Sequence, residues 1–186
     1  MKHTREFEIA WQGLKPGLQQ FAYEIDDKFM QEKGGDPLCS NWNAKVTLGF
    51  DKHESFFILN FDVNGGVTVQ CDRCGDDFEL RLWDEFKLVV KLVGEDAAEL
   101  EDEDDVVFIS RGETVIDISD WLYEFLMLSL PLQRIHPDGA DGESGCNKKA
   151  LSLLESMNEI PTAETQQIWK GLERLAKPDE KLPEIG

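Results

Sequence analysis

The residues with the clearest chemical potential are two cysteines separated by two residues, in the segment Cys71-Asp72-Arg73-Cys74-Gly75. Two thiolates at this spacing can chelate one zinc ion from a tight turn, and a following glycine relieves the backbone where the chain reverses. A structural zinc site needs four ligands, so one pair supplies only half of it. The pair is therefore either half of a metal site or two free thiols at a turn.

Further candidate ligands lie far downstream of this pair. His136 and Cys146 both follow the segment rich in leucine and proline near residue 131, and Cys39 is a less convincing third candidate. His136 and Cys146, without Cys39, would form a Cys₃His set with the first pair, a ligand combination found in structural zinc sites. Residues 137–145 separate the two downstream ligands, which exceeds the ordinary spacing of a second ligand pair. We predict zinc as the candidate cofactor, held by Cys71, Cys74, His136 and Cys146.

The surroundings of the cysteine pair disfavour a redox role. A dithiol of the thioredoxin type begins a helix, whose positive dipole end lowers the thiol pKa. Here the pair lies between two predicted strands, and the neighbouring Asp72 opposes thiolate formation electrostatically. The sequence also contains no phosphate loop, dinucleotide fingerprint or nucleophile elbow, and only three histidines. We therefore predict no enzymatic activity.

Arg73 is a candidate partner-binding residue. An arginine at the tip of such a turn points outward and can bind a phosphate or a carboxylate. The alternative is a solvated turn residue without a partner.

The chain is strongly acidic, with 38 acidic residues against 19 basic ones and a formal net charge of −19. Such a field repels the phosphate backbone of nucleic acids, whose affinity rests on lysine and arginine, and it attracts a basic protein. The alternative is that the charge only keeps the protein in solution. The charge alone leaves these two readings open, and any direct contact with nucleic acid would be limited to a local basic spot.

No apolar run approaches the roughly 20 residues of a membrane span, and the charged residues 1–6 do not form a signal peptide. We therefore expect a cytoplasmic location and no membrane partner. In a reducing cytosol the four cysteines are more plausibly metal ligands or free thiols than disulfides.

The region that must position the cysteine pair has a β pattern from Lys45 to Val93. Apolar residues alternate with polar ones in short runs, separated by the polar residues 51–54, by Asn64-Gly65 and by the cysteine turn. The Asn-Gly pair predicts a tight hairpin because both positions of that turn need positive φ. Consecutive hairpins predict an antiparallel sheet. Outside this region, residues 5–10 and 106–109 predict further strands, the second of them buried.

Helices are predicted on both sides of the β region. Leu18, Phe21, Ile25 and Phe29 have roughly helical spacing within 17–30, and Gly34-Gly35-Asp36-Pro37 breaks the chain after them. Asp117 caps a predicted helix that runs to Leu130 before Pro131. Its apolar end either packs on the sheet or forms a partner-binding surface. Two more helices are predicted, at 150–157 and, after Thr162, around Trp169 and Leu172, where the helix either packs or docks.

These elements predict an α+β fold in which a twisted, hairpin-rich antiparallel sheet, open or closed into a barrel, packs with one or more helices. We expect a single domain over residues 1–155 and a C-terminal helical tail over 156–186. An acidic run at 95–105 is expected to be an exposed loop, with metal binding as its alternative, and residues 138–149 a second, mobile loop.

The order of the motifs resembles the YceD family, the large ribosomal RNA subunit accumulation proteins. The resemblance rests on Val67-Thr68-Val69-Gln70 before the cysteine turn, Ile116-Asp117-Ile118 at a helix start, Leu128-Ser129-Leu130-Pro131-Leu132, and then His136 and Cys146. It covers roughly residues 45–146 and extends more weakly to Trp169 and Leu172. Members of the family often carry a second cysteine group after the Leu-Pro motif, where this chain has only Cys146.

The resemblance implies a role in the maturation or stability of large-subunit ribosomal RNA in bacteria and plastids, with no established enzymatic activity. Joined to the acidic charge, it implies a basic ribosomal protein or assembly factor as partner, or the ribosomal RNA itself, and no small-molecule substrate. The alternative from the residues is a small zinc- or redox-linked regulator that works through the turn of Cys71 and Cys74. A ribosomal RNA nuclease would need a carboxylate cluster in a cleft, and the only dense acidic run is the loop at 95–105.

Overall fold

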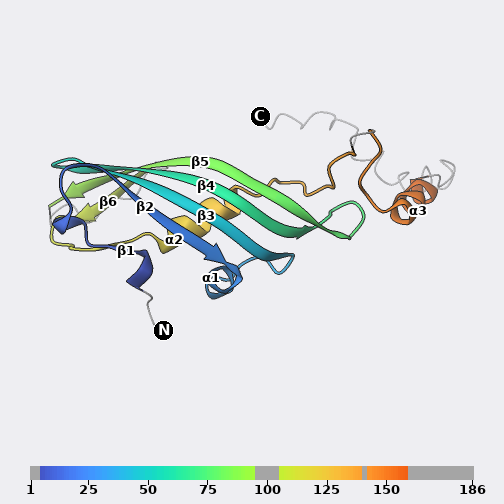
Figure 1. Ribbon diagram of the computed structural model, residues 1–186, viewed down its shortest axis with the longest axis horizontal. Helices are drawn as coiled ribbons and strands as arrows, with labels where there is room; N and C mark the ends of the chain where they lie inside the picture. The colour runs from blue at the N-terminus through green and yellow to red at the C-terminus, as the bar shows by residue number, and fades with distance from the viewer. Residues whose placement is uncertain (1–4, 95–104, 140–141, 159–186) are drawn as a thin grey trace, which may run out of the picture.

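The computed structural model describes residues 5–94, 105–139 and 142–158. Its centre is a five-stranded sheet in the order β2-β3-β4-β5-β6, and the helix α2 lies along one face of it (Figure 1). The strands of this sheet are β2 (Gly17–Asp26), β3 (Cys39–Lys52), β4 (Phe56–Gln70), β5 (Asp77–Val93) and β6 (Val106–Ser110). The other elements are η1 (Arg5–Phe7), β1 (Glu8–Ile9), η2 (Trp11–Gly13), α1 (Asp27–Glu32), β7 (Ile116–Asp117), α2 (Ser119–Leu128) and α3 (Lys148–Asn158).

The sheet is an antiparallel meander from β2 to β5, and β6 pairs in parallel with β5. A separate two-stranded sheet joins β1 to β7. The combination of sheets and a few helices agrees with the predicted α+β class. Because β2 and β6 form the two edges of the order, the described residues make an open sheet and no closed barrel. Among these residues, no helix has the length and apolar character needed to cross a membrane.

The core lies on one face of the sheet, where every second residue of the long strands is buried. Leu48, Phe50 and Phe57 have no exposed surface, and Leu122 and Leu126 of α2 cover them from the helix side with none of their own. This alternation is the β period of two that the sequence of residues 45–93 shows. The helix begins two residues after Asp117, whose carboxylate accepts a hydrogen bond from the Ser119 N–H at 2.9 Å. The exposed end of α2 is also apolar, since Leu128 is 67% exposed.

The helix predicted over residues 17–30 is wrong, because most of that segment is the edge strand β2. Phe21 pairs with Leu48 and Tyr23 with Val46, so alternate side chains enter the core, whereas Leu18 is 64% exposed. The apolar residues at 18, 21, 25 and 29 happen to have helical spacing, although most of the segment pairs as a strand. Only the last part forms a helix, α1, which Asp26 caps by accepting a hydrogen bond from the Phe29 N–H at 3.0 Å.

The hairpin predicted at Asn64-Gly65 is also wrong, because β4 runs straight through this pair. Gly65 has a φ of +150° and pairs with Ala44 on one side and Leu82 on the other. A Cβ on it would lie 2.3 Å from the carbonyl oxygen of Asn43, next to the point where the register between β3 and β4 shifts. The glycine therefore serves a close approach of two backbones at an irregularity in the sheet.

The prediction of an entirely antiparallel sheet fails at β6. A parallel pair needs a connection of about a dozen residues or more, and residues 94–105 provide one of that length between β5 and β6. This strand is half-buried, and not buried as predicted. The strand predicted at residues 5–10 shortens to the two residues of β1. The helix predicted at 150–157 is confirmed by α3. Of the acidic run at 95–105 only Asp105 is described, and it is exposed; the rest of the run and the helix after Thr162 lie outside the described residues.

Burial raises the pKa of Tyr23 to about 12. Since the pKa of the folded protein exceeds the unfolded value of about 10, this tyrosine stabilises the fold fully below pH 10 and loses that contribution as the pH rises towards 12. In a Tyr123→Phe variant, which keeps Tyr23 as its single tyrosine, we expect ultraviolet absorbance to report tyrosinate formation with a midpoint near 12. A midpoint near 10 would show that the side chain is accessible to water.

Candidate metal centre

The structure brings together the four side chains that the sequence nominated for metal binding. The ligand atoms of Cys71, Cys74, His136 and Cys146 all lie within 4.8 Å of one another. The Sγ atoms of Cys71 and Cys146 are 3.8 Å apart, and the Sγ of Cys74 is 3.4 Å from Nδ1 of His136. Residues separated by more than sixty positions therefore meet at one point of the fold.

The two shortest of these separations match a tetrahedral zinc centre. With Zn–S bonds of about 2.3 Å and Zn–N bonds of about 2.0–2.1 Å, tetrahedral angles place two sulfurs about 3.8 Å apart and a sulfur and a nitrogen about 3.5 Å apart. The observed distances are 3.8 Å between the two sulfurs and 3.4 Å between sulfur and nitrogen. The donor types and these two distances fit one zinc ion, and all four ligand atoms lie within 4.8 Å of one another.

The first two ligands are positioned by the turn between β4 and β5. The Cys71 N–H donates to the carbonyl oxygen of Asp76 at 2.9 Å, and the Gly75 N–H donates back to the carbonyl oxygen of Cys71 at 2.9 Å. Gly75 has a φ of +78°, a conformation that glycine adopts at low cost. The turn therefore directs Cys71 and Cys74 to the same side, as the sequence predicted.

The other two ligands lie on either side of a short backbone pairing. Asp138 and Ser144 form a β-bridge, and the Gly139 N–H donates to the carbonyl oxygen of Glu143 at 2.7 Å. The bridge brings residues 138 and 144 side by side, and His136 and Cys146 each lie two residues beyond it in the sequence. The long spacing between them in the sequence is therefore compatible with one site, and the described part of the loop predicted at 138–149 has regular pairing.

The protein environment favours a thiolate on Cys71. Burial raises the pKa of this thiol, but hydrogen bonds from the backbone N–H groups of Cys74, His136 and Arg73 outweigh it and lower the pKa to about 6. The pKa of Cys146 is instead raised, by burial first and then by its neighbours Cys71 and Cys74. N–H donors directed at a thiolate sulfur are also the kind of outer contact that supports a metal-bound cysteine.

Aromatic and amide contacts fix the surroundings of the cluster. The ring of His136 packs on that of Phe78, with 4.6 Å between the ring centroids. The side-chain amide of Asn147 donates to the carboxylate of Asp76 at 2.9 Å and so ties the segment after Cys146 to the cysteine turn. These contacts leave the His136 ring facing Cys74 through Nδ1.

One protein family matches the chain. The sequence model of the family described as "Large ribosomal RNA subunit accumulation protein YceD" matches residues 59–176, which is more than half of the chain and contains all four clustered residues. The chain belongs to the YceD family. No curated protein and no solved structure matches it. The predicted resemblance to this family is confirmed over residues 59–176, which include Trp169 and Leu172, whereas residues 45–58 lie before the matched region.

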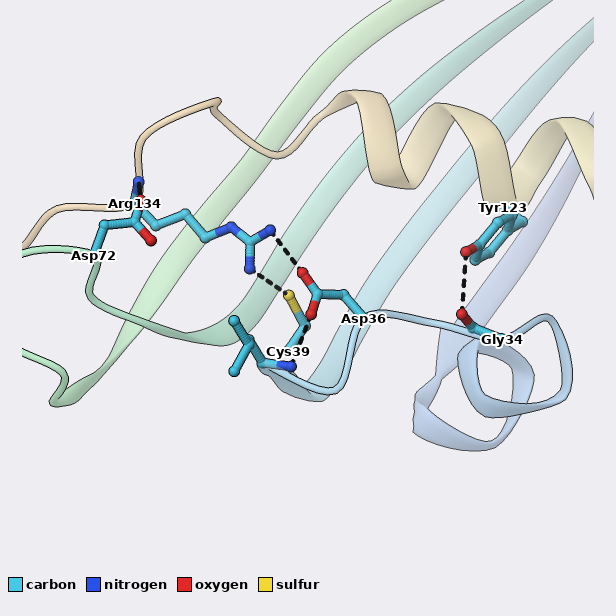
Figure 2. Close-up of polar contacts among 7 residues, drawn as sticks. Gly34, Asp36, Cys39, Asp72, Tyr123 and Arg134 are labelled. Atoms are coloured by element: carbon cyan, nitrogen blue, oxygen red, sulfur yellow. Dashed lines mark hydrogen bonds and ion pairs between the residues drawn. The ribbon is translucent and has the colours of Figure 1, made fainter.

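In this member of the YceD family, Cys39 lies outside the ligand cluster. Its Sγ accepts a hydrogen bond from the guanidinium of Arg134 at 3.4 Å (Figure 2). Arg73 is exposed at the tip of the cysteine turn, as its position in the sequence predicted. The sequence singles out Arg134 beside Arg73 but assigns it no role, and its contacts with Asp36, Cys39 and Asp72 appear only in the structure. Its charge carries no motif, and the only signal was its place two residues before His136.

The loop that joins His136 to Cys146 depends on Gly145. A Cβ at this position would lie 2.5 Å from the carbonyl oxygen of Pro137 and 3.2 Å from the Cβ of His136. We expect Gly145→Ala to push the two ligands apart and to weaken zinc affinity by at least about tenfold, measured by competition with a chelator. Gly13→Ala is the matched control, because nothing lies within 4 Å of its added Cβ. Equal affinities in the two variants would contradict the expectation.

Proposed function

We propose that this protein is a non-enzymatic factor that supports the accumulation or maturation of large-subunit ribosomal RNA in the cytoplasm, and that it acts by binding. Membership of the YceD family is the observation that carries the proposal, because the family is named for this role. In addition, all four residues of the cluster are potential metal ligands, which leaves no open coordination position of the kind a catalytic zinc site needs.

The partner we propose is a basic ribosomal protein or assembly factor, with ribosomal RNA contacted directly or through it. A net charge of −19 attracts such a protein and disfavours a broad contact with phosphate. A groove between α2, β5 and β6, lined by apolar and charged side chains in similar measure, supports the proposal. Its lining includes the apolar residues Phe86, Val107, Trp121, Phe125 and Leu128 and the acidic residues Glu85, Asp105 and Glu124, with Lys87. Arg73 remains the candidate for a local contact with phosphate.

We further infer that the four clustered residues hold one structural zinc ion. The ion would fasten the turn of Cys71 and Cys74 to the segment of His136 and Cys146, which the sequence places after α2. When bound, zinc supplies a cross-link between these two segments, and its binding energy becomes folding energy.

The proposed function is tested by sucrose-gradient profiles and ribosomal RNA quantitation in cells that lack the protein. We expect a selective fall in large subunits and in their RNA, restored by the wild-type gene. An unchanged profile under several growth conditions would refute the ribosomal role. The competing role, a zinc- or redox-linked regulator, is separated by complementation with Cys71→Ser/Cys74→Ser. Normal ribosome levels with a folded variant would show that the thiols are dispensable for the ribosomal role.

A further inference from the structure

Two residues outside the ligand set hold the two halves of the candidate metal centre in register. We propose that Arg134 and Asp72 are positioning residues for the zinc site, and that Asp36 anchors Arg134 to the loop between α1 and β3. The proposal rests on the zinc site proposed above. It assigns to these residues the task of placing His136 opposite Cys74 before the metal binds.

The backbone around Arg134 is paired directly with the cysteine turn. The Asp72 N–H donates to the carbonyl oxygen of Arg134 at 2.7 Å, and the Arg134 N–H donates to the carboxylate of Asp72 at 2.7 Å. Two residues further on, the backbone N–H of His136 donates to the sulfur of Cys71. Three hydrogen bonds thus hold residues 134–136 alongside residues 71–72. They fix the backbone position of His136, from which its ring extends.

The side chain of Arg134 has a second anchor, in the segment before β3, where its guanidinium reaches Asp36 and Cys39 (Figure 2). Its guanidinium contacts the carboxylate of Asp36 at 2.7 Å, and the two side chains are only 18% and 19% exposed. The pKa of Asp36 is lowered, first by the Leu38 N–H, which donates to its carboxylate at 2.8 Å, and then by Arg134. Because this pair is largely removed from water, loss of one partner leaves the other charge poorly solvated.

The same loop has an independent tie to α2, which separates positioning from general stability. Lys33 Nζ donates to the hydroxyl of Ser119 at 2.8 Å and contacts the carboxylate of Asp120 at 2.5 Å. This tie fastens the start of the loop to α2, and none of its residues belongs to the ligand cluster. Lys33→Met therefore removes another, more exposed ion pair of the same loop without changing the pairing of Arg134 with Asp72.

The experiment compares zinc affinity in full-length variants by chelator competition, together with the visible spectrum of the cobalt-substituted proteins. Asp72→Ala removes the acceptor for the Arg134 N–H, whereas Asp72→Asn keeps an acceptor oxygen and removes only the charge. We expect Asp72→Ala and Arg134→Ala to weaken zinc binding by about 10–100-fold. Asp72→Asn and Lys33→Met should bind zinc with an affinity within about threefold of the wild type. Neither variant removes a contact that orients a ligand, and only such outer contacts affect metal affinity.

The cobalt spectrum supplies the readout that a purely structural role would not move. We expect the cobalt bands of Asp72→Ala to shift, because displacement of His136 changes the ligand field, and those of Lys33→Met to match the wild type. Wild-type affinity and spectrum in Asp72→Ala would overturn the proposal, and so would an equal loss in Lys33→Met. Asp72 is exposed, so its variants test the idea even if Arg134→Ala does not fold. A wild-type protein that binds neither metal would overturn the zinc site itself, and this proposal with it.

Discussion

Replacement of Cys71 and Cys74 by serine is expected to abolish zinc binding and to lower the thermal midpoint of unfolding by about 10 °C or more. Serine hydroxyls do not replace thiolates as zinc ligands, so two of the four clustered donors disappear. The stability loss follows because metal binding contributes to folding, and a change of about 3–5 kcal/mol shifts the midpoint of a chain of this size by roughly that amount. Metal content by mass spectrometry and calorimetry of the purified protein would measure both effects.

Cys39→Ser is the matched control for this variant. Cys39 is also a free cysteine, but its sulfur contacts Arg134 and does not belong to the ligand cluster. We expect one zinc ion per chain in the wild type and in this control, and none in the double variant. A wild-type protein purified without zinc, which also gains no stability when zinc is added, would contradict the assignment of the metal.

We expect Gly65→Ala, which adds one methyl group, to lower the free energy of unfolding by about 3 kcal/mol or more. Losses of this size are typical of substitutions that cause backbone clashes or strained conformations. The Cβ of alanine would lie 2.3 Å from the carbonyl oxygen of Asn43 and 2.6 Å from the Cα of Ala44. These are backbone atoms, so β3 must move away from β4. The residue also has a φ of +150°, which side-chain-bearing residues rarely adopt. Urea unfolding of Gly65→Ala would measure the loss.

The adjacent Gly66 provides the control. Its added Cβ would meet only the carboxylate of Glu79 and the carbonyl oxygen of Leu80, both at 3.5 Å, which is ordinary contact. We expect Gly66→Ala to change the free energy of unfolding by no more than about 1 kcal/mol. Similar values for the two alanine variants would show that the sheet relaxes around Gly65 without cost.

The sequence carried enough information to predict the central strands and the members of the ligand cluster. The β alternation in residues 45–93 is strong because one face of the sheet is buried and the other is polar. Successive residues of each strand therefore alternate between apolar and polar types. The ligands were identifiable because few residue types bind zinc, and this chain contains only four cysteines and three histidines. Their meeting in space follows from the turn after β4 and the segment after α2.

The remaining features depend on neighbours that are distant in the sequence. The residues of β2 fit both a helix and a strand, and their pairing with β3 decided between the two. The Asn64-Gly65 pair has a strong turn preference, but in the structure the glycine allows the backbone of β4 to approach β3 closely beside an irregularity in the register of β3. The importance of Arg134 arises only once Asp36 and Asp72 are near it, and no local pattern encodes such an encounter.

The wide separation of the four ligands along the chain has a consequence for folding during synthesis. The meander from β2 to β5 pairs strands that follow one another, so it can assemble as soon as residue 93 is available. Cys71 and Cys146, however, are 75 positions apart. The hairpin that carries Cys71 and Cys74 is complete at Val93, 53 residues before Cys146 (146 − 93). At about 5–20 residues per second, synthesis of the last ligand therefore follows roughly 3–11 seconds later. A nascent or truncated chain thus presents two unprotected thiols, and closure of the cluster distinguishes a polypeptide that has been translated past Cys146.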